Sequence, residues 1–248
     1  MLIVNKLRKV FTDKSSQEIV AVNDLSFQAN AGEIVGILGM NGAGKSTTLR
    51  MLATVINPSS GEILLNNTNM RKNSLEVRRS IGFLSGTTGL YKRLTARETM
   101  VYFARLNGMK KNIIKERIDE LAGLLGMEEF IDRKCEKLST GQKQKVNIGR
   151  TIIHNPSLLI LDEATTGLDV VATQSIINFI NHMKNDQRVI LFSTHHMHEV
   201  ETLCDRVMIL HKGKLVAEGK TADVPAQLGC QNLQDVFAQY ADKVGGNE

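Results

Sequence analysis

Short apolar runs recur along this chain, separated by longer segments that have the periodicity of helices. Residues 34–38, 157–161 and 189–192 are largely apolar runs, which are typical of strands buried on both faces of a parallel sheet. Residues 24–28 alternate apolar and polar side chains instead, as a strand with one solvated face does. The pattern therefore predicts strands of both kinds, and the buried ones indicate a mostly parallel sheet between helices.

The middle of the chain, residues 90–155, has a helical pattern. Thr95 and Glu98 have the spacing of a capping box, so a helix is expected to begin there. Residues 112–125 place their apolar side chains on one helical face, and a third helix is expected to begin near Ser139. We interpret this block as a helical subdomain inserted into an α/β core.

A glycine-rich turn follows the apolar run 34–38 and fits the pattern G-x-x-x-x-G-K-[ST]. Glycines let the backbone curl with its N–H groups toward a phosphate, and a helix beginning at Lys45 adds the positive end of its dipole. Lys45 is expected to neutralise the β- and γ-phosphates, and the Ser46 hydroxyl to bind Mg²⁺. The alternative is a glycine-rich turn with an incidental lysine. The residues expected to contact the nucleotide are Gly39, Asn41, Gly42, Ala43, Gly44, Lys45, Ser46 and Thr47.

The chain of 248 residues is expected to form a single domain, 1–248, of the α/β class with a phosphate-loop NTPase core. An antiparallel β region is predicted near the N-terminus. The segments expected are an α/β core at 1–89 and 156–220, the helical subdomain at 90–155 and a helical tail at 221–248.

Composition narrows the class of protein. The chain is 42% hydrophobic and 23% charged, as soluble globular proteins are. It contains no apolar run of the ~18 residues that a membrane span needs and no basic leader at Met1, so a cytoplasmic protein is expected. The cysteines, Cys135, Cys204 and Cys230, lie far apart, which favours reduced thiols over a disulfide framework.

The net charge of +5 suggests nucleic acid or an anionic membrane as a partner. Only 4% of the residues are aromatic, and no basic run is interleaved with aromatic side chains. Because little is available for base stacking, we expect no nucleic-acid partner.

Two acidic residues, Asp162 and Glu163, come directly after the apolar run 157–161. The carboxyl ends of parallel strands meet the phosphate loop, so these side chains are expected near bound phosphates. A carboxylate there can hold Mg²⁺ and the next one can orient an attacking water, which assigns Asp162 to the metal and Glu163 to the general base. The alternative is a solvated acidic pair favoured by the dipole of the next helix.

Ser139, Gly141 and Gln142 stand at the expected start of the third helix of the inserted block. A hydroxyl and a glycine at a helix start form a second anion-binding arrangement. A capping serine followed by a flexible glycine is the simpler interpretation, and both stay open. With one nucleotide pocket per chain, a second anion site suggests that it closes on a nucleotide held by another copy.

Several segments occur in an order typical of one family. In the phosphate loop and in residues 138–142, 159–163, 166–169 and 193–195, the chain resembles the ATP-binding subunit of ABC transporters. The resemblance spans essentially the whole chain, and 138–142 is its most discriminating part, since other phosphate-loop NTPases lack it. It implies ATP and Mg²⁺ as cofactors. It also implies a head-to-tail homodimer, with each ATP held between the phosphate loop of one subunit and 138–142 of the other.

The resemblance also implies roles for single residues. It makes His195 the contact to the γ-phosphate, through a hydrogen bond from the imidazole. It places Asp169 at the dimer interface, where it would align the opposite site. Phe11 takes the place of the aromatic side chain that stacks on adenine, and the alternative for Phe11 is a core side chain at a strand end.

Three positions depart from the family pattern. Thr140 stands where glycine is usual and Ala164 where proline is usual, and both changes are small. Gly86 is the larger departure, because the family normally has a glutamine there that helps to ligate Mg²⁺ and relays the nucleotide state to the membrane subunit. We expect water to complete the metal shell in this chain.

Residues 86–91, 93–98, 102–108 and 192–200 are similar to the ATPase subunits of bacterial sodium-extrusion exporters. The similarity implies ATP hydrolysis that drives efflux, with Na⁺ as the cargo. It implies a separate transmembrane permease subunit of the ABC-2 exporter type, with this chain at the cytoplasmic face of the membrane.

The permease is expected to dock on the loop 85–91 and on the helix that begins near Thr95. Other functions stay open. They are export of a drug, lipid or other small molecule, a soluble ABC ATPase that acts on DNA or ribosomes, and an unrelated phosphate-loop GTPase or kinase.

Overall fold

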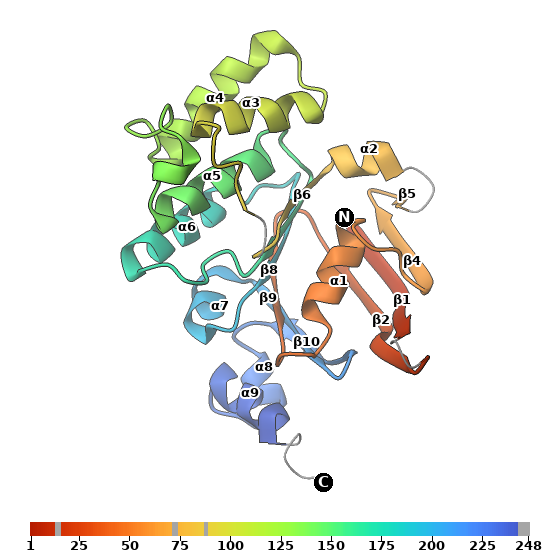
Figure 1. The fold of residues 1–248 in the computed structure, drawn as a ribbon. Coiled ribbons are helices and arrows are strands. Elements are labelled where there is room, and N and C mark those ends of the chain that lie inside the picture. The colour runs from red at the N-terminus through yellow and green to blue at the C-terminus, as the bar shows by residue number, and fades with distance from the viewer. Residues whose placement is uncertain (13–15, 71–73, 87–88, 243–248) are drawn as a thin grey trace.

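The computed structural model describes residues 1–12, 16–70, 74–86 and 89–242. Within these residues a six-stranded sheet lies at the centre, with a four-stranded antiparallel sheet beside it. Figure 1 shows the antiparallel sheet on one side of the molecule and a group of helices from the middle of the chain on the other. The predicted class, α/β with an antiparallel N-terminal region, is confirmed.

The central sheet has the strand order β10-β9-β3-β8-β7-β6. All its neighbouring strands pair in parallel except β10, which forms a hairpin with β9. The strands are β3 (Ile34–Leu38), β6 (Ile81–Leu84), β7 (Leu158–Asp162), β8 (Val189–Ser193), β9 (Arg206–His211) and β10 (Lys214–Lys220). Because β3, β7 and β8 are adjacent, the segments that follow them meet at one edge of the sheet.

The second sheet has the order β2-β1-β4-β5 and is antiparallel throughout. Its strands are β1 (Leu2–Thr12), β2 (Glu18–Ala29), β4 (Ser60–Leu65) and β5 (Thr68–Asn69). β2 buries Leu25, Phe27 and Ala29 and exposes the residues between them, as its alternating sequence predicts.

The helices are α1 (Lys45–Leu52), α2 (Ser74–Arg79), α3 (Ala96–Leu106), α4 (Lys111–Leu125), the short 3-10 turn η1 (Cys135–Lys137), α5 (Thr140–Ile152), α6 (Val170–His182), α7 (Met197–Leu203), α8 (Val224–Gln227) and α9 (Leu233–Asp242). Across the described part of the chain, none of them combines the length and the apolar character that crossing a membrane requires.

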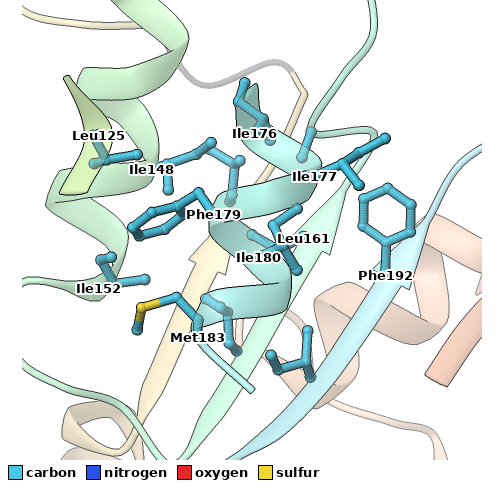
Figure 2. Close-up of a cluster of buried hydrophobic side chains, with 14 of the residues drawn as sticks. Leu125, Ile148, Ile152, Leu161, Ile176, Ile177, Phe179, Ile180, Met183 and Phe192 are labelled. Atoms are coloured by element: carbon cyan, nitrogen blue, oxygen red, sulfur yellow. The ribbon is translucent and has the colours of Figure 1, made fainter. Parts of the chain in front are cut away.

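The two faces of the central sheet belong to two hydrophobic cores. Leu159 and Leu161 of β7 face helices α3 to α7, whereas Leu158 and Ile160 face α1 and the antiparallel sheet. Figure 2 shows part of the helical side, where Phe179 of α6 points toward Leu125 of α4 and Ile148 and Ile152 of α5. The continuous apolar runs therefore reflect burial on both faces.

The helices of residues 90–155 form as their sequence predicts. The Thr95 hydroxyl accepts a 3.0 Å hydrogen bond from the Glu98 N–H, and the Glu98 carboxylate accepts one from the Thr95 N–H at 2.8 Å, which completes a capping box. α4 ends at Gly126, whose φ of 58° is left-handed. These helices share the hydrophobic core of the central sheet. The division of the chain into an α/β core, a helical subdomain and a tail stays a prediction.

Some elements were not predicted. α2 and β5 are short, and a few residues do not establish a periodicity. Residues 13–15, between β1 and β2, and residues 243–248, at the end of the predicted helical tail, lie outside the described residues.

Candidate active site

The phosphate loop connects β3 to α1, with α1 beginning at Lys45 as predicted. Gly39 and Gly44 have φ values of 151° and 99°, which side chains with a β-carbon rarely adopt. A β-carbon on Gly44 would also lie 2.6 Å from the carbonyl oxygen of Ala21. The loop therefore needs glycine at these positions for its backbone to take this path.

Lys45 is buried and its ammonium is held over the loop. Its Nζ donates hydrogen bonds to the carbonyl oxygens of Gly39 at 2.5 Å and Met40 at 3.2 Å. Burial lowers the pKa of Lys45, while the negative charges of Glu163 and Asp162 act in the opposite direction. The fold thus brings this cation close to the predicted acidic pair.

Asp162 ends β7 and is 5% exposed. Its Oδ1 accepts a hydrogen bond from Ser193 Oγ at 2.6 Å, and Ser46 Oγ lies 3.5 Å away. A carboxylate and an aliphatic hydroxyl are oxygen ligands of the kind that Mg²⁺ prefers. The donor set of Ser46 and Asp162 therefore fits the predicted metal.

Glu163 follows at the start of the next loop, with a left-handed φ of 54°. Its N–H donates to the carbonyl oxygen of Ser193 at 3.1 Å, which fixes the loop on β8. Glu163 Oε1 lies 3.9 Å from His195 Nδ1, and both side chains are partly open to solvent. The structure therefore brings together the two residues assigned to the water and to the γ-phosphate.

Ser193 is the site residue that the sequence interpretation missed, because it received no role there. It is fully buried at the end of β8, opposite Asp162 in the parallel pair. Its position at the end of an apolar run, two residues before His195, was the available signal.

Ser139 caps α5. Its hydroxyl accepts from the Gln142 N–H at 3.2 Å, and the Gln142 side chain accepts from the Ser139 N–H at 3.0 Å. Capping accounts for these bonds, and the anion-binding role of Ser139, Gly141 and Gln142 stays a prediction.

Asp169 caps α6 by accepting a 2.8 Å hydrogen bond from the Ala172 N–H. It shares with Ser139 and Gly141 the lining of an open groove of about 820 Å³. None of the described residues that line this groove belongs to the phosphate loop. The two predicted nucleotide-contact regions therefore do not form one pocket within a single chain.

Phe11 is 41% exposed on β1, opposite Ile19. Lys9 Nζ lies 5.0 Å from the centroid of its ring. The alternative that Phe11 is a core side chain is wrong, and stacking on adenine stays a prediction.

Gly86 lies beside the acidic pair. A β-carbon at this position would be 3.6 Å from the Asp162 carbonyl oxygen and 3.9 Å from Glu163 Oε2. A side chain here would thus begin beside the Glu163 carboxylate. The two residues that follow, 87 and 88, lie outside the described part of the loop.

Comparison with known proteins agrees with this geometry. The family model described as "ABC transporter" matches residues 22–166. The ABC transporter ATP-binding protein NatA of Bacillus subtilis is 40% identical, with 96% of each chain covered. The methionine import ATP-binding protein MetN 2 of Bacillus cereus is 37% identical over 95% of this chain and 70% of that protein.

Solved structures agree as well. The ATP-binding subunit of an ABC transporter superposes with a TM-score of 0.86 at 29% identity, covering 97% of this chain and 99% of the other. The ATP-binding cassette MJ0796, a dimer in a post-hydrolysis state with ADP and Pi, gives a TM-score of 0.79 at 25% identity over 89% and 98%. The chain belongs to the ABC transporter family, as an ATP-binding subunit.

Proposed function

We propose that the chain hydrolyses Mg-ATP and thereby drives export, with Na⁺ as the cargo, through a separate membrane subunit. The observation that best supports ATP hydrolysis is the arrangement of side chains around Glu163. Its carboxylate lies 3.9 Å from the His195 ring and close enough to the Lys45 ammonium to influence its pKa. The proposed base Glu163, the proposed phosphate contact His195 and the cation Lys45 follow the carboxyl ends of adjacent strands, which supports this function.

Each residue of the site has its own proposed role in ATP hydrolysis. Glu163 orients a water for in-line attack on the γ-phosphate and accepts its proton. Lys45 and the amides of the phosphate loop stabilise the charge on the transferring phosphoryl group, and His195 hydrogen-bonds to the γ-phosphate. Ser46 and Asp162 would hold Mg²⁺, which would supply further positive charge at the phosphates.

Two copies are proposed to close around the nucleotide. Ser139, Gly141 and Gln142 of one copy would reach the ATP bound to the other, with Asp169 at the interface. Two observations support this arrangement. The groove that these residues line lies apart from the phosphate loop, and a relative of the same fold has been solved as a dimer.

The membrane subunit is proposed to be an ABC-2-type permease, with this chain on the cytoplasmic face of the membrane. Its proposed docking site is the loop 85–91 together with α3, and residues 87–88 of that loop lie outside the described residues. Cysteine pairs placed between this loop and the permease are expected to cross-link. A complete lack of cross-links along the loop would contradict the docking site.

Na⁺ as the cargo is supported by the similarity of residues 86–91 and 192–200 to sodium-extrusion exporters, and by the NatA relative. The MetN relative, an import protein by its name, supports a second candidate, in which the same ATPase serves another cargo.

The test is flux of radioactive Na⁺ into inside-out vesicles that carry this chain and its co-purifying membrane protein. We expect ATP-dependent uptake that is abolished by Glu163→Gln. ATP hydrolysis without Na⁺ uptake would refute the cargo and leave the ATPase intact. A chain that hydrolyses no ATP with its membrane protein present would refute the ATPase.

A further inference from the structure

One buried carboxylate has no role in the mechanism above. Glu199 of α7 is 6% exposed. Its Oε2 accepts hydrogen bonds from Thr165 Oγ1 at 2.8 Å and from Thr194 Oγ1 at 2.7 Å. Of the ion pairs formed by the described residues, none involves Glu199. A buried charge that is compensated by hydroxyl groups rather than by a cation is costly, so its presence calls for a specific role.

The two threonines belong to the two loops that carry the predicted reacting groups. Thr165 lies in the loop that begins with Glu163, and Thr194 directly precedes His195. Both are buried, at 3% and 2% exposure. The parallel pairing of β7 and β8 ends with Asp162 opposite Ser193, and the last backbone bond between the two segments runs from the Glu163 N–H to the Ser193 carbonyl oxygen. Beyond that bond the sheet does not link the two loops.

A further hydrogen bond extends the link to the backbone. The His196 N–H donates to Thr194 Oγ1 at 3.1 Å, and that hydroxyl donates its own hydrogen to Glu199. A charged acceptor polarises the hydroxyl and strengthens the bond that it accepts. The carboxylate therefore restrains the chain on both sides of His195.

We propose that Glu199 is a positioning residue for ATP hydrolysis, which holds the loop of Glu163 and the loop of His195 in a fixed relation without contacting the nucleotide. The proposal rests on the ATPase function proposed above. Glu163 Oε1 and His195 Nδ1 are 3.9 Å apart, and movement of one loop changes where the water is held relative to the γ-phosphate contact. A misplacement of about 1 Å costs about 100-fold in rate.

The experiment compares variants in pairs. Glu199→Ala removes the acceptor, whereas the amide oxygen of Glu199→Gln can still accept from both threonines. Thr194→Val removes the hydroxyl at nearly constant shape, whereas Thr194→Ser keeps it. Glu201→Ala, an exposed position on the same helix, is the control.

Steady-state ATP hydrolysis is measured on the full-length chain with its co-purified membrane subunit. We expect Glu199→Ala and Thr194→Val to lower kcat roughly 10- to 100-fold. We expect KM for ATP to change less than about threefold, because neither residue contacts the nucleotide. Glu199→Gln and Thr194→Ser should recover most of kcat, and Glu201→Ala should match the unaltered chain.

Thermal unfolding shows which variants are folded. If Glu199→Ala is not folded, the comparison of Thr194→Val with Thr194→Ser tests the proposal. Unaltered kcat in Thr194→Val, or a loss confined to KM, overturns the proposal. Absence of hydrolysis by the unaltered chain is a separate result, which refutes the proposed function and, with it, a role of Glu199 in hydrolysis.

Discussion

Ser193 Oγ donates a 2.6 Å hydrogen bond to Asp162 Oδ1 at the last rung of the pair β7–β8. The bond fixes one oxygen of the carboxylate and leaves Asp162 oriented toward Ser46. The Ser193 hydroxyl is not itself a predicted metal ligand. It thus sets the orientation of the Asp162 carboxylate, which is one.

Ser193→Ala is expected to weaken the apparent affinity for Mg²⁺ about 10-fold, since outer partners of metal ligands commonly contribute this much. The apparent Mg²⁺ affinity is measured by the dependence of the ATP hydrolysis rate on the free Mg²⁺ concentration. Ser157→Ala, a serine that precedes β7 at the opposite end of the strand, is the control. An unchanged Mg²⁺ titration in Ser193→Ala would contradict the role of the bond.

Glu163→Gln is expected to bind ATP normally, to lower kcat about 100- to 10,000-fold and to accumulate a dimer, because the amide cannot accept the proton of water. Size-exclusion chromatography with ATP and steady-state kinetics check both effects. A monomer that hydrolyses ATP at the normal rate would refute the assignment of Glu163 as the base.

Lys45→Ala is expected to lose about 1.5–3 kcal/mol of nucleotide-binding free energy, the contribution of hydrogen bonds to a charged group. Equilibrium titration with a fluorescent ATP analogue measures the change in Kd. Lys115→Ala, an exposed lysine on α4, should bind like the unaltered chain. Equal nucleotide affinity in the unaltered chain and both variants would contradict the assignment of the phosphate loop as the nucleotide-binding site.

Gly86→Gln is expected to strengthen the apparent affinity for Mg²⁺ without loss of folding. Among the described residues, a β-carbon at Gly86 meets its nearest neighbour, the Asp162 carbonyl oxygen, at an ordinary 3.6 Å, and it lies 3.9 Å from Glu163 Oε2, so a side chain can begin there beside the acidic pair. Gly86→Ala adds the β-carbon alone and separates the effect of the amide from that of bulk. If both variants titrate with Mg²⁺ like the unaltered chain, position 86 does not reach the metal.

His154 predicts a pH dependence of stability. Burial is the main cause that lowers the pKa of His154; Arg117 acts in the same direction, and the hydrogen bond to the Ile81 carbonyl opposes it. The unfolded histidine, with a pKa of about 6.5, binds more protons than the folded one in the window below that value. This residue therefore lowers the free energy of unfolding as pH falls below about 6.5.

Replacing the ring with His154→Gln, which keeps a donor for Ile81, should reduce the loss of stability between pH 7 and pH 5. Urea unfolding midpoints at pH 7 and pH 5 measure this loss of stability in the variant and in the unaltered chain. An identical pH dependence in the variant and in the unaltered chain would show that His154 does not contribute.

The sequence by itself determined the elements and the local chemistry. Runs that are apolar on both faces define β3, β7 and β8, and the capping box at Thr95 and the capping serine Ser139 define the starts of α3 and α5. The phosphate loop could be identified from a short stretch of sequence because its backbone path requires glycine at fixed positions. The acidic pair could also be identified locally, because it directly follows a buried strand.

Only the tertiary structure decided which distant side chains meet. Asp162 and Ser193 are 31 residues apart, and Thr165 and Glu199 are 34 apart. Parallel strands are joined by long crossovers, so the pairing of β7 with β8 that creates these contacts has no local sequence pattern. The roles of Ser193 and Glu199 therefore emerge only when burial, hydrogen-bond partners and strand order are seen together.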